Sequence, residues 1–368
     1  MCVEFPELEP LTAGGTPAVI AGPCSAETEE QVMDTARALA AGGVTVFRAG
    51  LWKPRTMPGC FDGVGERGLP WMERVKAETG MALATEVATP EHAAAALDAG
   101  IDILWLGART VSDPFAVQRV ADCLAARSEK PAVLVKNPLS PDIDLWTGAL
   151  LRIYNAGVRR LGAVHRGFCT YGRSEYRNDP LWSVPFELRR RYPLLPLLCD
   201  PSHIAGRRGL VEQVAARALD MGFDGLIVES HCRPEAALSD AAQQLTPGRL
   251  LHFMATHPAV RAAEAPADCL DELRARIDAV DAELIDLLAR RMAVSAEIGR
   301  MKKDSNMTAV QPRRFNDMMA GRLAAGAARG LDPAFLSRLW TVIHEESVRC
   351  QTDVMLGGTP ADGSESEK

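Results

Sequence analysis

Residues 132–137 read AVLVKN, an apolar run that ends in a lysine and an asparagine. A short, continuous apolar run of this kind is typical of a parallel β-strand that is buried on both faces. Similar runs recur at intervals along the first two thirds of the chain. The seven others are residues 17–24, 44–50, 81–87, 103–108, 160–167, 195–202 and 225–230.

Alanine- and leucine-rich stretches separate these runs and are long enough to form crossover helices. They include residues 28–41, 90–99, 114–126 and 210–221. Eight strand–helix units within about 250 residues predict an α/β fold, a (β/α)8 TIM barrel, over residues 1–255. A doubly wound open sheet is the alternative, but such sheets usually have fewer strands.

The alternation of strands and helices stops after residue 255. Residues 256–267 contain two prolines and several alanines, which indicates a linker. Residues 268–355 then carry apolar residues at steps of three and four, the spacing of amphipathic helices, with helix starts near Pro312 and Asp332. These residues are expected to form a small all-α three-helix domain, and the polar residues 356–368 to form a disordered tail.

Composition narrows the class of protein. The chain has 368 residues, of which 47% are hydrophobic, and its net charge of −7 is spread along it, which argues against a nucleic-acid partner. Its apolar runs are too short to cross a membrane, and its acidic N-terminus lacks the features of a secretory signal. Nine cysteines without a CxxC pair do not indicate a disulfide framework. We therefore expect a cytoplasmic protein with no membrane or nucleic-acid partner.

Positively charged side chains stand at or just beyond the ends of four of the eight predicted strands. In (β/α)8 enzymes the C-terminal ends of the strands meet at one rim, which carries the active site. Cations gathered there would repel one another unless they bind highly anionic ligands, and Arg and Lys suit phosphate and carboxylate groups. The six cations are Arg48, Lys53, Arg55, Arg109, Lys136 and Arg166. The alternative for each of them is a surface cation paired with a neighbouring carboxylate.

A thiol, an imidazole and carboxylates stand at other strand ends. Cys24 ends the first predicted strand, His203 follows the seventh, and Glu229 ends the eighth, with Asp240 a short distance beyond. This mixture of soft and hard ligands suits a divalent transition metal. A catalytic metal also keeps one position open for a substrate oxygen. Taken singly, Cys24 would be interpreted as a buried thiol and His203 as a capping or core histidine.

Short motifs surround these residues in a fixed order. They are AGPCS at 21–25, FRAG at 47–50, KPRT at 53–56, LGAR at 106–109, VKNP at 135–138, HRG at 165–167, DPSH at 200–203 and VESH at 228–231. Together they resemble type-I 3-deoxy-D-arabino-heptulosonate 7-phosphate (DAHP) synthases, in the short form related to octulosonate 8-phosphate synthases. The resemblance covers about residues 17–253, and too many ordered motifs agree for chance to explain them.

This resemblance implies a metal-dependent condensation of phosphoenolpyruvate with erythrose 4-phosphate, which gives DAHP and phosphate. The metal (manganese, iron, cobalt or zinc) would be bound by Cys24, His203, Glu229 and Asp240. Phosphoenolpyruvate would be held by Arg48, Lys53, Arg109, Lys136 and Arg166. Erythrose 4-phosphate would contact the catalytic Lys53, Arg55 and Thr56. Glu86 is a candidate for the residue that positions water.

Two other functions stay open for the barrel. An octulosonate 8-phosphate synthase would use arabinose 5-phosphate, but such enzymes typically show Lys-Ala-Asn-Arg-Ser where this chain has KPRT at residues 53–56. A sugar-phosphate-binding protein without catalytic activity would release no phosphate from the two substrates.

Polar residues of the helical domain also form a pattern. They are Arg274, Arg291, Lys302, Arg314 and Gln351. They resemble the substrate-binding set of all-helical, AroQ-class chorismate mutases, over about residues 270–351 and without a gap. The resemblance implies conversion of chorismate to prephenate, with arginines on the carboxylates and Lys302 and Gln351 at the ether oxygen, where negative charge builds up. Phe315 stands where this class commonly has Glu, and Gln311 where an acidic residue is frequent, so a contact to a substrate hydroxyl is lost.

Members of this class form intertwined dimers in which one arginine of each site, at the Arg274 position, comes from the partner chain. We therefore expect a homodimer through the helical domain. The chain is then either a bifunctional enzyme or a synthase whose mutase-like domain is a weak catalyst and a sensor, with prephenate or chorismate as the inhibitor. These two interpretations can coexist. A domain that serves only dimerisation or regulation is the remaining alternative.

Overall fold

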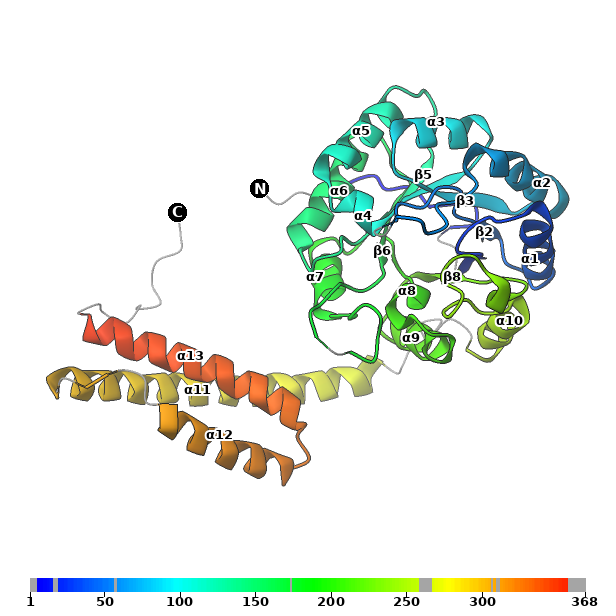
Figure 1. Ribbon diagram of the computed structural model, residues 1–368. Helices are drawn as coiled ribbons and strands as arrows, with labels where there is room; N and C mark the ends of the chain where they lie inside the picture. Colours follow the sequence, from blue (N-terminus) through cyan, green and yellow to red (C-terminus); the bar gives the residue numbers. More distant parts are fainter. Residues whose placement is uncertain are drawn as a thin grey trace. The chain divides into compact units, whose positions relative to one another are not determined.

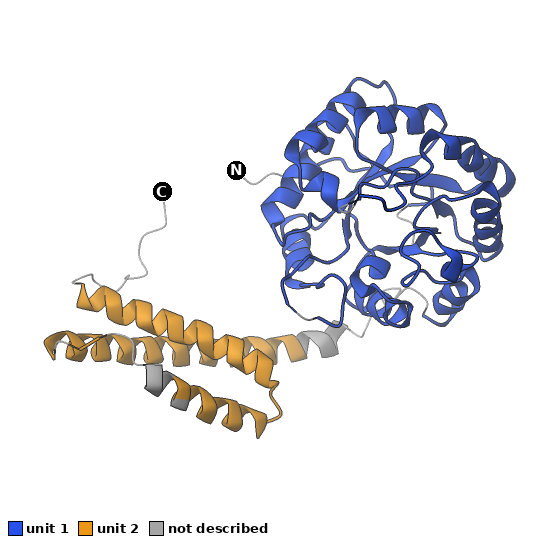
Figure 2. Cartoon of the chain, viewed as in Figure 1, with its two compact units in different colours: residues 1–261 blue, residues 262–368 orange. Residues whose placement is uncertain are grey.

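The computed structural model describes residues 5–15, 19–55, 58–172, 174–257, 267–305, 307–308 and 312–356, with side chains for all of these except 267–272, 312–315 and 317. The chain divides into two compact units, residues 1–261 and 262–368, which Figure 2 colours separately. The division falls within the expected linker, most of which lies outside the described residues. The expected tail beyond residue 356 also lies outside them.

Unit 1 is a closed barrel of eight parallel strands that pair in sequence order (Figure 1). The strands are β1 Val19–Gly22, β2 Val46–Arg48, β3 Ala82–Val87, β4 Ile103–Leu106, β5 Ala132–Lys136, β6 Leu161–His165, β7 Leu197–Cys199 and β8 Gly225–Glu229. The pairing of β1 with β8, in which Ile20 lies opposite Ile227, closes the sheet. The prediction of a (β/α)8 barrel is confirmed, and the open sheet is excluded.

Helices cover the outer face of these strands (Figure 1). They are α1 Glu29–Ala41, α2 Leu69–Thr79, α3 Pro90–Asp98, α4 Ala108–Val111, α5 Pro114–Ala125, α6 Ile143–Asn155, α7 Ser183–Arg191, α8 Pro201–Ala205, α9 Arg208–Asp220 and α10 Pro247–Thr256, with the 3-10 turns η1 Gly65–Gly68 and η2 Pro234–Ala236. Several helix starts are encoded locally. Thr28, Thr89 and Asp113 each accept a hydrogen bond from a backbone N–H group in the first turn.

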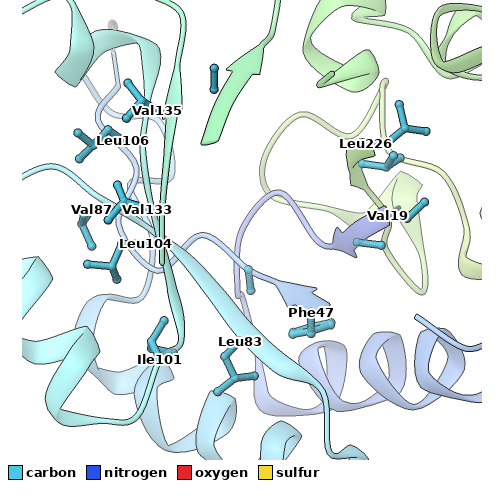
Figure 3. Packing of buried hydrophobic residues seen from close by; sticks show 14 of the residues in the cluster. Val19, Phe47, Leu83, Val87, Ile101, Leu104, Leu106, Val133, Val135 and Leu226 are labelled. Atoms are coloured by element: carbon cyan, nitrogen blue, oxygen red, sulfur yellow. The ribbon is translucent and has the colours of Figure 1, made fainter. Parts of the chain in front are cut away.

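Apolar side chains fill both sides of the barrel sheet. Because successive side chains of a strand point to opposite faces, Leu104 and Leu106 of β4 face the helices, whereas Trp105 faces the barrel interior. Figure 3 shows Leu104 beside Val133, its register partner on β5. Leu11 belongs to the interior cluster, so the N-terminal segment, to which the sequence assigned no role, contributes to the core.

Most strands are shorter than the predicted runs, and at two of them a short helix begins inside the predicted range. The run at 195–202 ends as a strand at Cys199, since Asp200 caps α8 and Pro201 occupies its first turn. The run at 103–108 ends as a strand at Leu106, and α4 begins at Ala108 after Gly107, without a side-chain cap. An apolar run alone does not separate the end of a buried strand from the first turn of a buried helix.

Unit 2 contains α11 Ala267–Asp304, α12 Pro312–Ala327 and α13 Pro333–Met355, as predicted (Figure 1). Helices α11 and α13 approach closely at Gly299, where a Cβ atom would lie 2.9 Å from the Cα of Gln351. Large apolar side chains of α11 remain exposed, including Ile277 at 61%, Val280 at 63% and Leu284 at 51%. Exposed apolar rows of this kind are characteristic of interaction surfaces. Among the described helices of both units, none is long and apolar enough to cross a membrane.

Candidate functional site

Cys24, His203, Glu229 and Asp240 lie together at the C-terminal ends of the barrel strands. Ligand atoms of Cys24, Glu229 and Asp240 all lie within 4.8 Å of one another. The Cys24 thiol donates to Asp240 Oδ2 at 3.3 Å. The Nε2 atom of His203 is 3.7 Å from Glu229 Oε1 and 4.0 Å from Asp240 Oδ2. The structure thus brings together all four residues that were predicted as metal ligands.

Asp200 orients the imidazole of this cluster. Its carboxylate accepts a hydrogen bond from the His203 backbone N–H, and its Oδ2 lies 2.8 Å from His203 Nδ1. Burial alone would raise the pKa of Asp200, but His203 and Lys136 hold it well below its usual range. An ionised carboxylate on Nδ1 leaves Nε2 for the cluster, which is the usual support for a metal-binding histidine.

The donor set of the cluster fits a divalent transition metal. One sulfur, one ring nitrogen and two carboxylates form the mixture of soft and hard ligands that such ions prefer. Glu229 Oε1 is buried and has no hydrogen-bond partner among the described residues, as expected for an atom that awaits a cation. Burial and the charge of Glu229 raise the pKa of the Cys24 thiol to about 12. A metal would therefore have to displace its proton.

A pocket with many cations adjoins this cluster. It is lined by Lys53, Pro54, Arg55, Glu86, Gly107, Ala108, Arg109, Lys136, Arg166, Arg177, His203 and Asp240. Five of the six predicted cations therefore line one pocket. The sixth, Arg48, is fully buried, and its Nη2 atom lies 3.6 Å from Glu229 Oε1. Thr56, also predicted to contact a substrate, lies outside the described residues.

Besides Arg48, two of these cations have buried carboxylate partners. Lys136 Nζ donates to Asp200 Oδ2 at 2.7 Å, and Lys53 Nζ lies 3.5 Å from Glu86 Oε2. Burial alone would raise the pKa of Glu86, but Lys53 and other nearby cations outweigh it and lower that pKa. The Glu86 side chain is therefore an anion in a pocket of cations.

Arg177 is a pocket residue that the sequence did not reveal. It lies in the loop between β6 and α7, and its Nη1 donates to Asp240 Oδ1 at 2.9 Å and to Gln243 Oε1 at 2.8 Å. Gln243 in turn donates to Glu229 Oε2 at 2.7 Å. The two side chains connect both carboxylates of the cluster. Their role could not be predicted from the ends of the strands, because both residues belong to long loops.

Unit 2 carries a second polar site between its helices. Lys302 on α11 donates to Gln351 Oε1 on α13 at 2.9 Å. Arg291 donates to the Ser347 hydroxyl and, at 3.2 Å, to the Ile343 carbonyl. Three of the predicted residues thus lie at the contact of α11 with α13. Ser347 is a neighbour that the sequence did not single out, although it precedes Gln351 by one helical turn.

The other two predicted residues of unit 2 are Arg274 and Arg314. Arg274 is exposed on α11. The Arg314 side chain lies outside the described residues, as do Gln311 and the Phe315 side chain. Arg322 of α12 stacks on the Trp340 ring of α13, with its Cζ atom 4.0 Å from the ring centroid.

Two protein families match the two units. Residues 7–262 match the DAHP synthetase I family, and residues 273–352 match chorismate mutase type II. Both matches agree with the resemblances that the motifs indicated.

Individual relatives also match one unit or the other, and three of them match the barrel. A phospho-2-dehydro-3-deoxyheptonate aldolase from Thermotoga maritima is 36% identical over 227 residues, which span 62% of this chain and 64% of the relative. A crystal structure of such an aldolase from that organism superposes with a TM-score of 0.58 and 32% identity, covering 65% of this chain and 67% of that one. A 2-dehydro-3-deoxyphosphooctonate aldolase from Nitratidesulfovibrio vulgaris is 30% identical, over 60% of this chain and 84% of the relative.

The helical unit has its own relative. A 4-amino-4-deoxychorismate mutase from Streptomyces pristinaespiralis is 37% identical over 107 residues, which span 28% of this chain and 83% of the relative. With the barrel matched over its whole length, the chain belongs to the DAHP synthetase I family and carries a chorismate mutase type II domain in its helical unit.

Proposed function

We propose that the barrel condenses phosphoenolpyruvate with erythrose 4-phosphate in a metal-dependent reaction that gives DAHP and phosphate. The observation that carries this proposal is the meeting of the Cys24, Glu229 and Asp240 ligand atoms beside a pocket lined by cations. Two phosphorylated reactants need such a pocket, and a metal beside it is placed to polarise a substrate oxygen.

Different residues of the site have different roles in this reaction. A bound divalent cation supplies a Lewis acid for the aldehyde oxygen of erythrose 4-phosphate. Arg48, Lys136 and neighbouring cations hold phosphoenolpyruvate, so that its C3 attacks the aldehyde carbon. Water adds at C2, and phosphate leaves from that carbon. The fixed cations also stabilise the negative charge that develops, and they do so without rearranging.

Glu86 has the properties expected of the residue that positions the attacking water. Its carboxylate lines the pocket, and its lowered pKa keeps it ionised at neutral pH, so that it accepts hydrogen bonds from water. Its neighbour Lys53, whose Nζ atom lies 3.5 Å from Glu86 Oε2, balances the charge of this anion.

Consumption of phosphoenolpyruvate tests the proposal directly. The purified chain is incubated with either erythrose 4-phosphate or arabinose 5-phosphate, before and after removal of metal with a chelator. We expect consumption with erythrose 4-phosphate only, its loss with the chelator, and its return with manganese or another divalent transition metal. Preference for arabinose 5-phosphate would identify an octulosonate synthase, and no phosphate release from either sugar would leave a binding protein.

The approach of Gly107 to Glu86 gives a local prediction. A Cβ atom on Gly107 would lie 2.1 Å from Glu86 Oε1, so Gly107→Ala has to displace that carboxylate. We expect the condensation rate to fall by about 100-fold, the cost of misplacing a reacting group by about 1 Å. Gly248→Ala on α10 is the matched control, because a Cβ atom there would meet nothing within 4 Å. Equal rates for the two variants would contradict the assigned position of Glu86.

We further propose that unit 2 converts chorismate to prephenate. Arg291 and Lys302, placed between α11 and α13, are suited to the carboxylates and the ether oxygen of chorismate. The Streptomyces relative acts, by its name, on 4-amino-4-deoxychorismate, which favours that amine as a second candidate substrate. Comparing the two substrates at equal concentration decides which one the site prefers.

The same unit is proposed to mediate dimerisation and feedback in a cytoplasmic enzyme. The exposed apolar residues of α11 would be covered in a homodimer, which would also place Arg274 of one chain at the site of the other. Prephenate, bound in unit 2, would then inhibit the barrel. An unchanged synthase rate at saturating prephenate would remove the feedback, and a mutase rate near zero would leave unit 2 as a sensor only.

A further inference from the structure

Trp105 lies in the barrel interior beside Arg48 and beside Lys136, which lines the pocket. It belongs to β4, is 0% exposed, and packs in the interior apolar cluster. Its ring faces two of the buried cations at once. The Cζ atom of Arg48 is 4.6 Å from the ring centroid, and the Nζ atom of Lys136 is 5.8 Å from it. Both distances are within the range of cation–π attraction.

The two cations differ in how fully they are paired. Lys136 donates to Asp200 at 2.7 Å. Arg48 has one nitrogen near Glu229 and the Cys24 carbonyl, but its buried Nε and Nη1 atoms find no hydrogen-bond partner in the described part of the chain. Buried, unpaired donors on a guanidinium are costly unless a ligand accepts from them. The ring is therefore the main neighbour that compensates Arg48 without using its donors.

An aromatic ring is suited to this position for an electrostatic reason. A further carboxylate at this position, in addition to Glu229 and Asp200, would neutralise the two cations more fully and repel an anionic ligand. The face of an indole ring attracts a cation through its quadrupole and carries no net charge. It therefore adds no negative charge to the pocket and leaves the unpaired Nε and Nη1 donors of Arg48 available to a ligand. Hydrogen bonding does not explain the residue, because the indole Nε1 is itself buried without a partner among the residues described.

We propose that Trp105 is a positioning residue for the phosphoenolpyruvate half of the site: its ring holds Arg48 and Lys136 in place while leaving them charged for the anion. This inference rests on the proposed function of the barrel. It assigns to Trp105 an effect on the affinity for one substrate, not on the chemistry or on the binding of the aldose phosphate.

Binding of phosphoenolpyruvate to the metal-free protein, measured by calorimetry at fixed ionic strength, tests this role. Trp105→Met keeps an apolar side chain of useful size but removes the ring, and we expect its Kd to rise about tenfold, equivalent to about 1.4 kcal/mol. Trp105→Phe keeps a ring face and should stay within about threefold of the natural chain. In the metal-loaded enzyme, the KM for phosphoenolpyruvate should rise in parallel while that for erythrose 4-phosphate stays unchanged.

A control separates this role from simple loss of packing. Leu39 of α1 is also 0% exposed but belongs to the layer between strands and helices, so Leu39→Ala should lower Tm and leave the Kd unchanged. The inference would be wrong, and the proposed function unaffected, if Trp105→Met bound phosphoenolpyruvate with the Kd of the natural chain. The same would follow if Trp105→Phe bound it as weakly as Trp105→Met. A natural chain that binds no phosphoenolpyruvate would overturn the proposed function and the inference with it.

Discussion

Cys24→Ala is expected to weaken metal binding by more than about 100-fold, because losing an outer partner of a ligand already costs 10–100-fold in metal affinity. Cys24 supplies the only sulfur among the four clustered ligands, and its Sγ atom lies 3.3 Å from Asp240 Oδ2. With the Lewis acid lost, several kcal/mol of transition-state stabilisation disappear, so the condensation rate should fall by at least about 100-fold. Titration with manganese or zinc against a chromophoric chelator measures the first effect, and phosphate release the second.

The chain offers a matched control for this variant. Cys199 on β7 is likewise a buried, free cysteine near a strand end, but it is not part of the ligand cluster. Cys199→Ala should therefore keep the metal affinity and the rate of the natural chain, whatever it costs in stability. If Cys24→Ala kept the condensation rate of the natural chain after treatment with a chelator, the proposed metal site would be wrong.

The barrel could be predicted because its strands are buried on both faces. Such strands read as unbroken apolar runs, and these are visible without any knowledge of packing. Their ends were less predictable. At β7, the predicted strand included residues 200–202, but the Asp200 side chain caps a helix that starts at Pro201. The apolar run alone does not show which of the two structures these residues adopt.

The site was predictable where it follows strand ends, and not where it depends on loops. Cys24 follows β1, Glu229 ends β8, and His203 lies in the short helix that follows β7. Parallel strands deliver such residues to one rim. Asp240 and Arg177 lie in loops whose course the local sequence does not determine. Asp240 was indicated by the resemblance to a family, whereas the ion pair of Arg177 with it is visible only in the structure. Trp105 gave no signal either, because an aromatic residue in a strand is ordinarily core.

Unit 2 shows the same division between pattern and packing. The three helices follow from the spacing of apolar residues and from the cap at Asp332. The exposed apolar row on α11 follows from that spacing too, but only the structure shows that α13 and α12 leave it uncovered. The sequence alone did not distinguish these residues from buried core residues. The spacing of apolar residues predicts which face of a helix is apolar, but not which element packs against that face.

Lys302→Ala is expected to lower the mutase rate of unit 2 by about 100- to 1,000-fold, the usual cost of removing one donor aimed at a developing negative charge. The reason is its position. Its Nζ atom donates to Gln351 Oε1 at 2.9 Å, so the ammonium and the amide are held together at the contact of α11 with α13. Disappearance of chorismate, followed by its ultraviolet absorbance, measures the rate.

Lys303→Ala provides the comparison, because Lys303 is the next residue of α11, carries the same charge and is exposed. Its mutase rate should match that of the natural chain, since one step along a helix turns the side chain away from the α13 contact. The synthase rate should be the same in both variants, because all residues of the proposed synthase site belong to unit 1. If both lysine variants lost the mutase rate equally, net charge and not the Lys302–Gln351 pair would be responsible. If Lys302→Ala kept its full rate, unit 2 would have to act through another group or serve as a sensor only.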